Sequence, residues 1–251
     1  MTENKSTVME EKISAALDLK IFNDLFFDIL KRLEADTLYN LRVVSKQWYN
    51  LIFDSQFAYY NLSYAVPGVM LQTPDQVSYK LGFIEMKGGE IMVRDLNMGF
   101  PRPVRASCNG LVLVEDFPEL GDLFVGNLVT KKAMKVPVRL GSLGQDRVIG
   151  FTYIPQTREY KIVRQVINIS TGVVYKILTL GYNEWREIKG PWPWLAPRSS
   201  ADKPISINSF IHSLDHEHSL FSIDTADETP HTTALPGKRG FIFCDNFYLW
   251  C

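Results

Sequence analysis

The chain has 251 residues, with 27 Lys and Arg against 28 Asp and Glu, so its formal net charge is −1. This balance argues against a general nucleic-acid binder, which carries a basic surplus, and against a polybasic membrane patch. Hydrophobic residues make up 46% of the sequence and charged residues 22%. That composition is typical of a globular chain with one large or two small domains.

The cysteines and the apolar runs predict a reducing compartment. Cys108, Cys244 and Cys251 are scattered and odd in number, which favours neither a disulfide framework nor a Cys-rich zinc site. The polar first residues lack the basic and apolar regions of a signal peptide. No uncharged apolar run approaches the roughly 18 residues of a membrane helix. We therefore expect the cytoplasm or the nucleus, with no membrane and no nucleic acid as partner.

A helical segment follows a polar tail over residues 1–18. Leu25, Ile29 and Leu33 recur at i, i+4 and i+8, which predicts an amphipathic helix. Asn23 and Asp24 provide a candidate N-cap and a negative charge at the start of this helix.

Two more short helices are expected before residue 57. Asp36 or Thr37 can cap the second helix and Ser45 the third. Three short helices have more apolar side chains than one small core can bury. The excess indicates either a docking surface for another protein or packing against the following domain, and the pattern leaves both open.

Beyond residue 60 the sequence consists of short apolar or alternating runs separated by turn clusters, such as Ser107–Gly110 and Ser170–Gly172. No helical pattern of 10–15 residues intervenes, which favours an antiparallel sandwich, barrel or propeller. Residues 123–137, 177–191 and 219–236 share one plan, at intervals of roughly 45 to 55 residues. Each has an apolar strand, a polar turn and a second short strand. This repeat predicts hairpins that end kelch-like blades, with Trp185 between neighbouring sheets.

The helical segment resembles an F-box. The matching positions are Asp24, Leu25, Ile29, Leu30, Arg32, Leu33, Leu38, Arg42, Val44, Ser45, Lys46, Trp48, Leu51 and Ile52. The segment departs from the family pattern at Ile21-Phe22, where Leu-Pro is usual, and at Glu34, where Pro is common. The resemblance implies docking on a Skp-family adaptor and, through it, on a cullin. The residues it assigns to adaptor binding are Phe22, Leu25, Ile29, Leu30, Leu33, Leu38, Leu41, Val44, Trp48 and Leu51.

The rest of the chain is similar to the F-box-associated domain of plant F-box proteins. The similarity lies in Ser107–Leu111, Gly150–Tyr153, Tyr160–Val163, Asn183–Arg186 and Phe221–Asp224. Asn127-Leu128 stands where the family has Asn-Pro. Family members usually continue past the point that matches Leu249–Cys251, which leaves open a shortened member, a fragment or a domain that closes differently.

The expected fold is therefore an α+β multidomain chain. A three-helix F-box precedes an all-β, propeller-like F-box-associated domain. The predicted parts are a tail (1–18), the F-box (19–57), a connecting segment with the first strands (58–104) and the β domain (105–251).

The sequence offers no catalytic constellation and no cofactor motif. His212 and His216 have the i, i+4 spacing of helical zinc ligands, but residues 210–220 read as strand, turn and strand, so we expect no metal. Cys108 has no evident base, and we expect it to be a small buried residue. Trp192 and Trp194 are a candidate substrate loop, with packing between blades as the alternative.

These features predict a non-catalytic subunit of a Skp–cullin–F-box ubiquitin ligase. Its helices would dock on the Skp adaptor, and its β domain would bind an unknown target protein for ubiquitination. The alternative is a β-propeller-like protein-binding module that does not assemble into a ligase.

Overall fold

The computed structural model describes residues 24–74, 79–87, 89–100, 104–115, 122–137, 145–168, 172–190, 204–214 and 219–234. The chain divides into two compact units, Met1–Val66 and Pro67–Cys251, and each is described by itself. Several residues singled out in the sequence lie outside the described ranges: Phe22, Trp192, Trp194 and His216.

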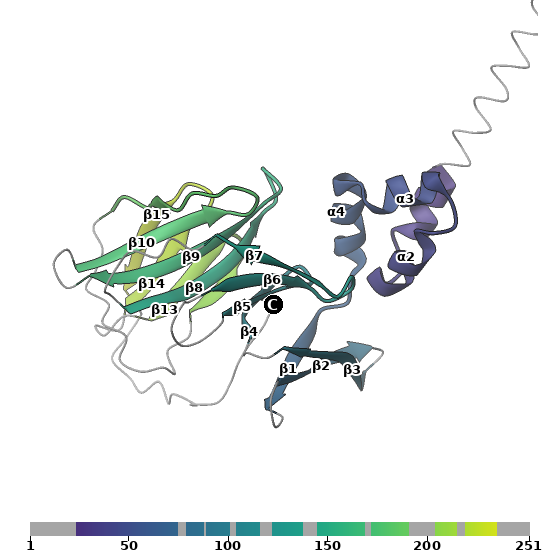
Figure 1. The fold of residues 1–251 in the computed structure, drawn as a ribbon, viewed down its shortest axis with the longest axis horizontal. Helices are drawn as coiled ribbons and strands as arrows, with labels where there is room; N and C mark the ends of the chain where they lie inside the picture. The colour runs from purple at the N-terminus through teal and green to yellow at the C-terminus, as the bar shows by residue number, and fades with distance from the viewer. Residues whose placement is uncertain are drawn as a thin grey trace, which may run out of the picture. The chain divides into compact units, whose positions relative to one another are not determined.

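The first unit is helical, as predicted (Figure 1). Residues 24–30 form a helix. They are followed by α2 (Ala35–Leu41), α3 (Lys46–Ile52) and α4 (Ser55–Tyr64). The fourth helix was not predicted, and it runs through the boundary that the sequence placed between residues 57 and 58.

Side-chain caps fix where two of these helices begin. The Ser45 hydroxyl accepts the backbone N–H of Trp48 at 3.1 Å, which confirms the predicted cap of α3. The Asp54 carboxylate accepts the N–H groups of Gln56 and Phe57 and caps α4 in the same way. The prediction for α2 was wrong, because the helix begins directly after Glu34, whose side chain makes no cap.

Helix α4 completes the helical unit because it satisfies backbone carbonyls of the turn that follows the first helix. The carbonyls at the end of a helix have no partners within it. The Asn61 side-chain amide donates to the carbonyl oxygens of Lys31 and Leu33, at 3.0 and 2.8 Å. The Phe27 ring packs edge-on against Phe57, with 5.5 Å between ring centroids.

The second unit is built of four consecutive antiparallel sheets in a propeller-like arrangement (Figure 1), as predicted. Sheet 1 contains β1 (Gly68–Pro74), β2 (Tyr79–Lys87) and β3 (Glu90–Phe100). Sheet 2 contains β4 (Val104–Cys108), β5 (Leu111–Glu115), β6 (Leu123–Asn127) and β7 (Lys132–Val136). Sheet 3 contains β8 (Gln145–Ile154), β9 (Glu159–Asn168), β10 (Gly172–Thr179) and β11 (Arg186–Glu187). Sheet 4 contains β12 (Ile205–Ile207), β13 (Phe210–Leu214), β14 (Ser219–Asp224) and β15 (Thr229–Ala234).

The sequence repeat corresponds to the last two strands of sheets 2, 3 and 4. In sheets 2 and 4 the turn between these strands is held by the side chain that ends the first strand. Asn127 accepts two backbone N–H groups of its turn, and Asp224 does the same. Four residues later, Lys131 and Glu228 have positive φ angles of 56° and 57°. The predicted turn at Asn109-Gly110 has positive φ at both residues, which a two-residue hairpin turn requires.

Apolar clusters join each sheet to the next. Sheets 2 and 3 share a cluster formed by Leu113, Leu123, Val125, Val136, Phe151, Ile162 and Leu178. Sheets 3 and 4 share another, formed by Ile149, Val163, Val173, Tyr175, Ile177, Ile188, Ile211, Phe221 and Ile223. Sheet 3 is thus buried on both faces, and six consecutive residues of β9, from Lys161 to Val166, are buried.

Trp185 lies between sheets 2 and 3, as predicted. Its ring packs against their shared cluster, and its indole N–H donates to the Pro137 carbonyl at 2.6 Å. No helix in the described part of the chain is long and apolar enough to cross a membrane.

Candidate functional site

The helical unit has a very small core. Leu30, Leu38 and Phe57 are almost fully buried, and other apolar side chains pack around them: Phe27, Leu33, Leu41, Trp48, Leu51 and Ile52. Because these few residues fill the interior, the remaining apolar side chains of the unit face outward.

The residues assigned to adaptor binding divide into two groups. Six of them form or line the core: Leu30, Leu33, Leu38, Leu41, Trp48 and Leu51. Three have exposed side chains, with Leu25 exposed by 56%, Ile29 by 50% and Val44 by 59%. Phe22, the tenth, lies outside the described residues.

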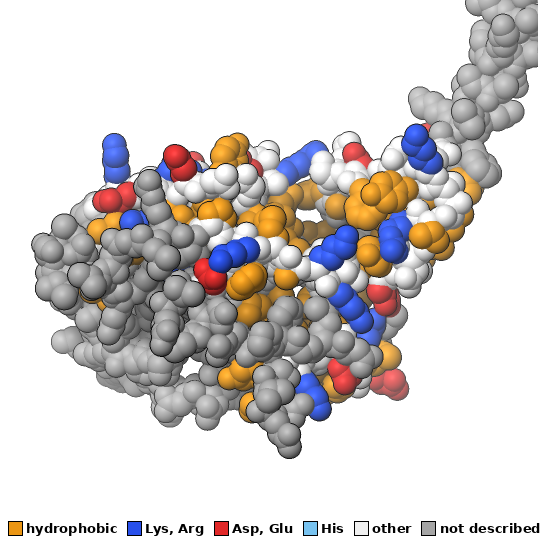
Figure 2. Space-filling model, in the orientation of Figure 1, with side chains coloured by type: hydrophobic (Ala, Val, Ile, Leu, Met, Phe, Trp, Pro, Cys, Tyr) orange, Lys and Arg blue, Asp and Glu red, His pale blue; other side chains and the backbone are white. Residues whose placement is uncertain are grey.

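The most exposed apolar side chain of the unit is Val43, at 77%. The helical period did not single it out, because Val43 follows α2 and lies in the turn before α3. We name Leu25, Ile29, Val43 and Val44 the outward apolar set. Figure 2 shows hydrophobic side chains gathered on the surface of the helical unit, interspersed with Lys and Arg side chains. Exposed apolar side chains that gather on one surface are typical of protein-interaction sites.

A second group of exposed apolar residues lies on α3. Tyr49 and Phe53 are both half exposed, and their ring centroids are 4.6 Å apart. Their i, i+4 spacing places them on one face of the helix. The sequence analysis did not select this pair, although the spacing was visible in it.

Glu34 replaces the family's usual proline without changing the course of the backbone. Its φ angle is −64° and its ψ angle 147°. Proline is restricted to a φ near −65°, so Glu34 adopts the conformation that a proline would impose. The substitution therefore leaves the start of α2 where a proline would place it.

Cationic side chains tie the end of the first helix to α4. Lys31 pairs with Asp28 at 2.5 Å, and their hydrogen bond lowers the pKa of Asp28 and raises the pKa of Lys31. The Arg32 guanidinium and the Lys31 ammonium lie 5.1 and 5.6 Å from the centroid of the Tyr64 ring. These contacts hold the first helix, which carries Leu25 and Ile29, against α4.

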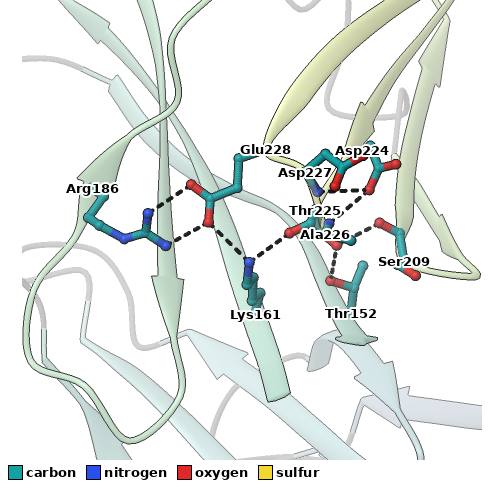
Figure 3. A network of polar contacts seen from close by, with 9 residues as sticks. All are labelled: Thr152, Lys161, Arg186, Ser209, Asp224, Thr225, Ala226, Asp227 and Glu228. Atoms are coloured by element: carbon teal, nitrogen blue, oxygen red, sulfur yellow. Dashed lines mark hydrogen bonds and ion pairs between the residues drawn. The ribbon is translucent and has the colours of Figure 1, made fainter. Parts of the chain in front are cut away.

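The β unit contains an ionic network at the junction of sheets 3 and 4 (Figure 3). The Lys161 ammonium on β9 donates to the Thr225 carbonyl at 2.9 Å and to the Glu228 carboxylate at 3.0 Å. Both terminal nitrogens of Arg186 donate to Glu228, at 2.9 and 2.6 Å. Burial acts to raise the pKa of Glu228, but hydrogen bonds and charges from Arg186 and Lys161 lower it below its ordinary value.

The same network continues through hydroxyl groups. The Thr225 hydroxyl lies 2.9 Å from the Thr152 hydroxyl on β8 and donates to the Ser209 carbonyl at 2.5 Å (Figure 3). The network therefore fixes the turn that ends β14 against sheet 3.

In the described part of the chain, the positions of the histidines and of Cys108 do not favour metal binding or thiol chemistry. His212 lies on β13 rather than on a helix, and its Nδ1 is 2.7 Å from the Ser222 hydroxyl. Burial lowers the pKa of His212. No group of three His, Cys, Asp or Glu residues that could hold a metal ion occurs within the described ranges. Burial raises the pKa of the Cys108 thiol to about 11.

The family model that matches this chain is the F-box domain, over residues 19–59. The chain therefore contains an F-box domain. It is 27% identical over 199 residues to the F-box protein CPR1 of Arabidopsis thaliana, a match that covers 70% of this chain and 46% of the relative. The F-box protein thus spans about half the length of the curated relative it matches.

The solved structures most similar in fold include a puromycin hydrolase and an oligogalacturonate lyase in complex with manganese. They are 14% and 13% identical, each has a TM-score of 0.41, and the matches cover 68% and 67% of the F-box protein and 28% and 45% of those chains. An uncharacterised protein from Listeria monocytogenes follows with 9% identity and a TM-score of 0.38, covering 63% of the F-box protein and 59% of that chain. At TM-scores below 0.5 these similarities carry no functional argument.

Proposed function

We propose that this F-box protein is a substrate-recognition subunit of a Skp–cullin–F-box ubiquitin ligase. The helical unit binds a Skp-family adaptor, which joins it to a cullin, and the β unit binds a target protein for ubiquitination. The subunit itself is non-catalytic, uses no cofactor and works in the cytoplasm or the nucleus.

The observation that carries the adaptor role is the outward apolar set on a matched F-box domain. Burying a fully exposed Val, Leu or Ile side chain contributes about 1.5–3 kcal/mol. Leu25, Ile29 and Val44 are already about half covered and Val43 less so, which leaves about 1 kcal/mol or more for each on docking. Leu25, Ile29, Val43 and Val44 together then supply a sizeable part of the affinity of a stable complex.

We further propose that the β unit is an F-box-associated domain. Supporting this are its position after the F-box and its repeated antiparallel sheets, each of sheets 2 to 4 ending in the hairpin that the repeat predicts. The candidate substrate loop with Trp192 and Trp194 stays a proposal, since it lies outside the described residues.

Co-purification tests this function. The full chain is expressed with a Skp-family adaptor and a cullin and analysed by size exclusion. We expect one complex that contains all three chains. If the F-box protein elutes alone at concentrations where other F-box proteins bind, it is a protein-binding module that does not assemble into a ligase.

A further inference from the structure

Strand β3 forms one edge of sheet 1 and has an apolar surface. Among the strands that the structure describes, it pairs only with β2, and the register of this pair is uninterrupted from Glu90 to Asp95. Ile91 and Val93 are each 68% exposed, and Met92 between them is 45% exposed. Successive side chains of a strand point to opposite faces, so both faces of this edge are apolar. The backbone groups along such an edge are a template for another strand.

The last strands of the other three sheets have features that oppose edge pairing. Strand β7 carries Lys132 and Lys135, β11 is only 2 residues long, and β15 contains Pro230. Lysine, shortness and proline are common means of protecting a sheet edge. Strand β3 has 11 residues and contains neither lysine nor proline. Of these four last strands, β3 is therefore the one suited to pairing with a further strand.

The sequence of this edge is complementary to itself. An antiparallel strand can pair with the same strand of a second copy about a two-fold axis beside one residue. With the axis at Met92, Ile91 of each copy lies opposite Val93 of the other, and Glu90 lies opposite Arg94. Apolar groups then meet apolar groups, and charges of opposite sign meet. Both kinds of cross-strand pair stabilise a sheet.

The charges select this axis among the neighbouring ones. The Arg94 guanidinium donates to the buried Glu85 carboxylate at 3.2 and 2.8 Å, yet its side chain remains 37% exposed. A guanidinium has five N–H donors, so Arg94 can also hold a second carboxylate. Moving the axis by one residue in either direction would place Arg94 opposite Met92 or Gly88 instead of Glu90.

We propose that two copies of this chain pair through β3, antiparallel about a two-fold axis at Met92. The two three-stranded sheets then form one continuous sheet across the dimer. One pair of strands buries less than the roughly 1,600 Å² of a standard stable interface, so the dimer is weak and reversible. The pairing does not depend on the ligase role. In a ligase of the proposed kind, the dimer presents two target-binding units side by side.

Sedimentation velocity of the full chain over a range of concentrations tests the pairing. We expect a reversible monomer–dimer equilibrium that stops at two chains, because an isologous interface closes. Val93→Lys should weaken the dimer at least about tenfold, since it places a lysine on the edge of each copy. Glu90→Lys should weaken it about three- to tenfold, since like charges then face each other.

Leu71→Lys is the matched control variant, because Leu71 is an exposed apolar residue on β1, at the other edge of the same sheet. It should dimerise as the wild type does, and all three variants should unfold at the wild-type temperature. A chain that stays monomeric at every concentration, growth into larger oligomers, or equal dimerisation of Val93→Lys and the wild type would each overturn the proposal.

Disulfide trapping tests the register. In a chain with Cys244→Ser and Cys251→Ser, Met92→Cys places two thiols directly opposite each other, with Cβ atoms about 4.5–5.5 Å apart. Oxidised glutathione, which is reduced as the two thiols are joined, should therefore link the copies. Ile91→Cys is the control, because its two copies are diagonal neighbours about 7–8 Å apart and should link far less. Equal linkage of the two variants, or none in Met92→Cys, would contradict an axis at Met92.

Discussion

Cys108 illustrates how burial alone makes a thiol unreactive. Its pKa is raised to about 11 because desolvation disfavours the thiolate, which is the reactive form. We expect iodoacetamide to modify Cys108 of the native chain slowly near pH 8 and faster as the pH approaches 11. In urea the rate should instead level off near the thiol's ordinary pKa of about 9. Peptide mapping by mass spectrometry follows Cys108 alone, and a native rate that already levels off near pH 9 would contradict the burial.

Gly150 on β8 packs against sheet 4 with no room for a side chain. A Cβ atom at this position would lie 2.4 Å from Cδ1 and 2.5 Å from Cγ1 of Ile211, which is itself buried in the shared cluster. We expect Gly150→Ala to lower the free energy of unfolding by about 1–3 kcal/mol in urea melts. Gly82→Ala is the control, since its Cβ would meet no atom closer than 3.6 Å. Similar midpoints for the two variants would show that sheet 4 does not pack against β8 in this way.

At the scale of elements, the ionic network makes the turn between β14 and β15 of sheet 4 contribute to the stability of sheet 3. Removing the charge of Glu228 leaves the buried Lys161 ammonium without the carboxylate that pairs with it among the described residues. We expect Glu228→Gln to cost about 3 kcal/mol of unfolding free energy. Arg186→Gln should cost less than about 1 kcal/mol, because the Arg186 side chain is more than half exposed. Chemical denaturation measures both, and equal losses would mean that Lys161 has another partner.

The Glu228 carboxylate also predicts that the stability of the fold depends on pH. The pKa of Glu228 is lower in the folded chain than its ordinary value of 4.5, so its contribution to stability is complete above that value. The contribution is lost as the pH falls through the folded pKa. The stability difference between wild type and Glu228→Gln should therefore be constant near neutral pH and shrink below about pH 4.5. A difference that does not change with pH would contradict the ionic network.

The elements that sequence predicts well are those whose signals are local. The first three helices follow from apolar spacing, and the hairpins of sheets 2 to 4 follow from a repeat that includes its own turn. Helix α4 was missed because its aromatic residues have the composition of a strand, although Asp54 was there to cap it. The sequence also did not reveal that Lys131 and Glu228 end their turns with positive φ angles, since a positive φ is usually found at glycine. The partners of Lys161 lie more than sixty residues away along the chain, a separation at which periodicity gives no information.

At the scale of the whole molecule, the structure separates two roles that the sequence placed in one list. Trp48 was assigned to adaptor binding, yet it packs on the small helical core, with its ring 5.5 Å from that of Phe26. We expect Trp48→Ala to abolish adaptor binding because it destabilises the helical unit by about 3 kcal/mol or more. Hydrogen exchange should then show the amides of α3 losing protection. Lost binding with full protection would place Trp48 in the interface instead.

Substitutions in the outward apolar set test the proposed adaptor binding without disturbing the core of the helical unit. Val43 and Val44 are exposed and can be replaced by serine at little cost to folding. Ile205 and Ile207 on β12 are also an exposed apolar pair, in the other unit, and provide the control.

The most direct measurement is isothermal titration of a Skp-family adaptor into the full chain and into these two double variants. We expect the Val43→Ser, Val44→Ser variant to bind the adaptor at least about tenfold more weakly than the wild type. The Ile205→Ser, Ile207→Ser variant should bind as the wild type does, with all three chains unfolding at the same temperature. Equal adaptor affinity in all three chains would contradict the claim that the outward apolar set is the docking surface.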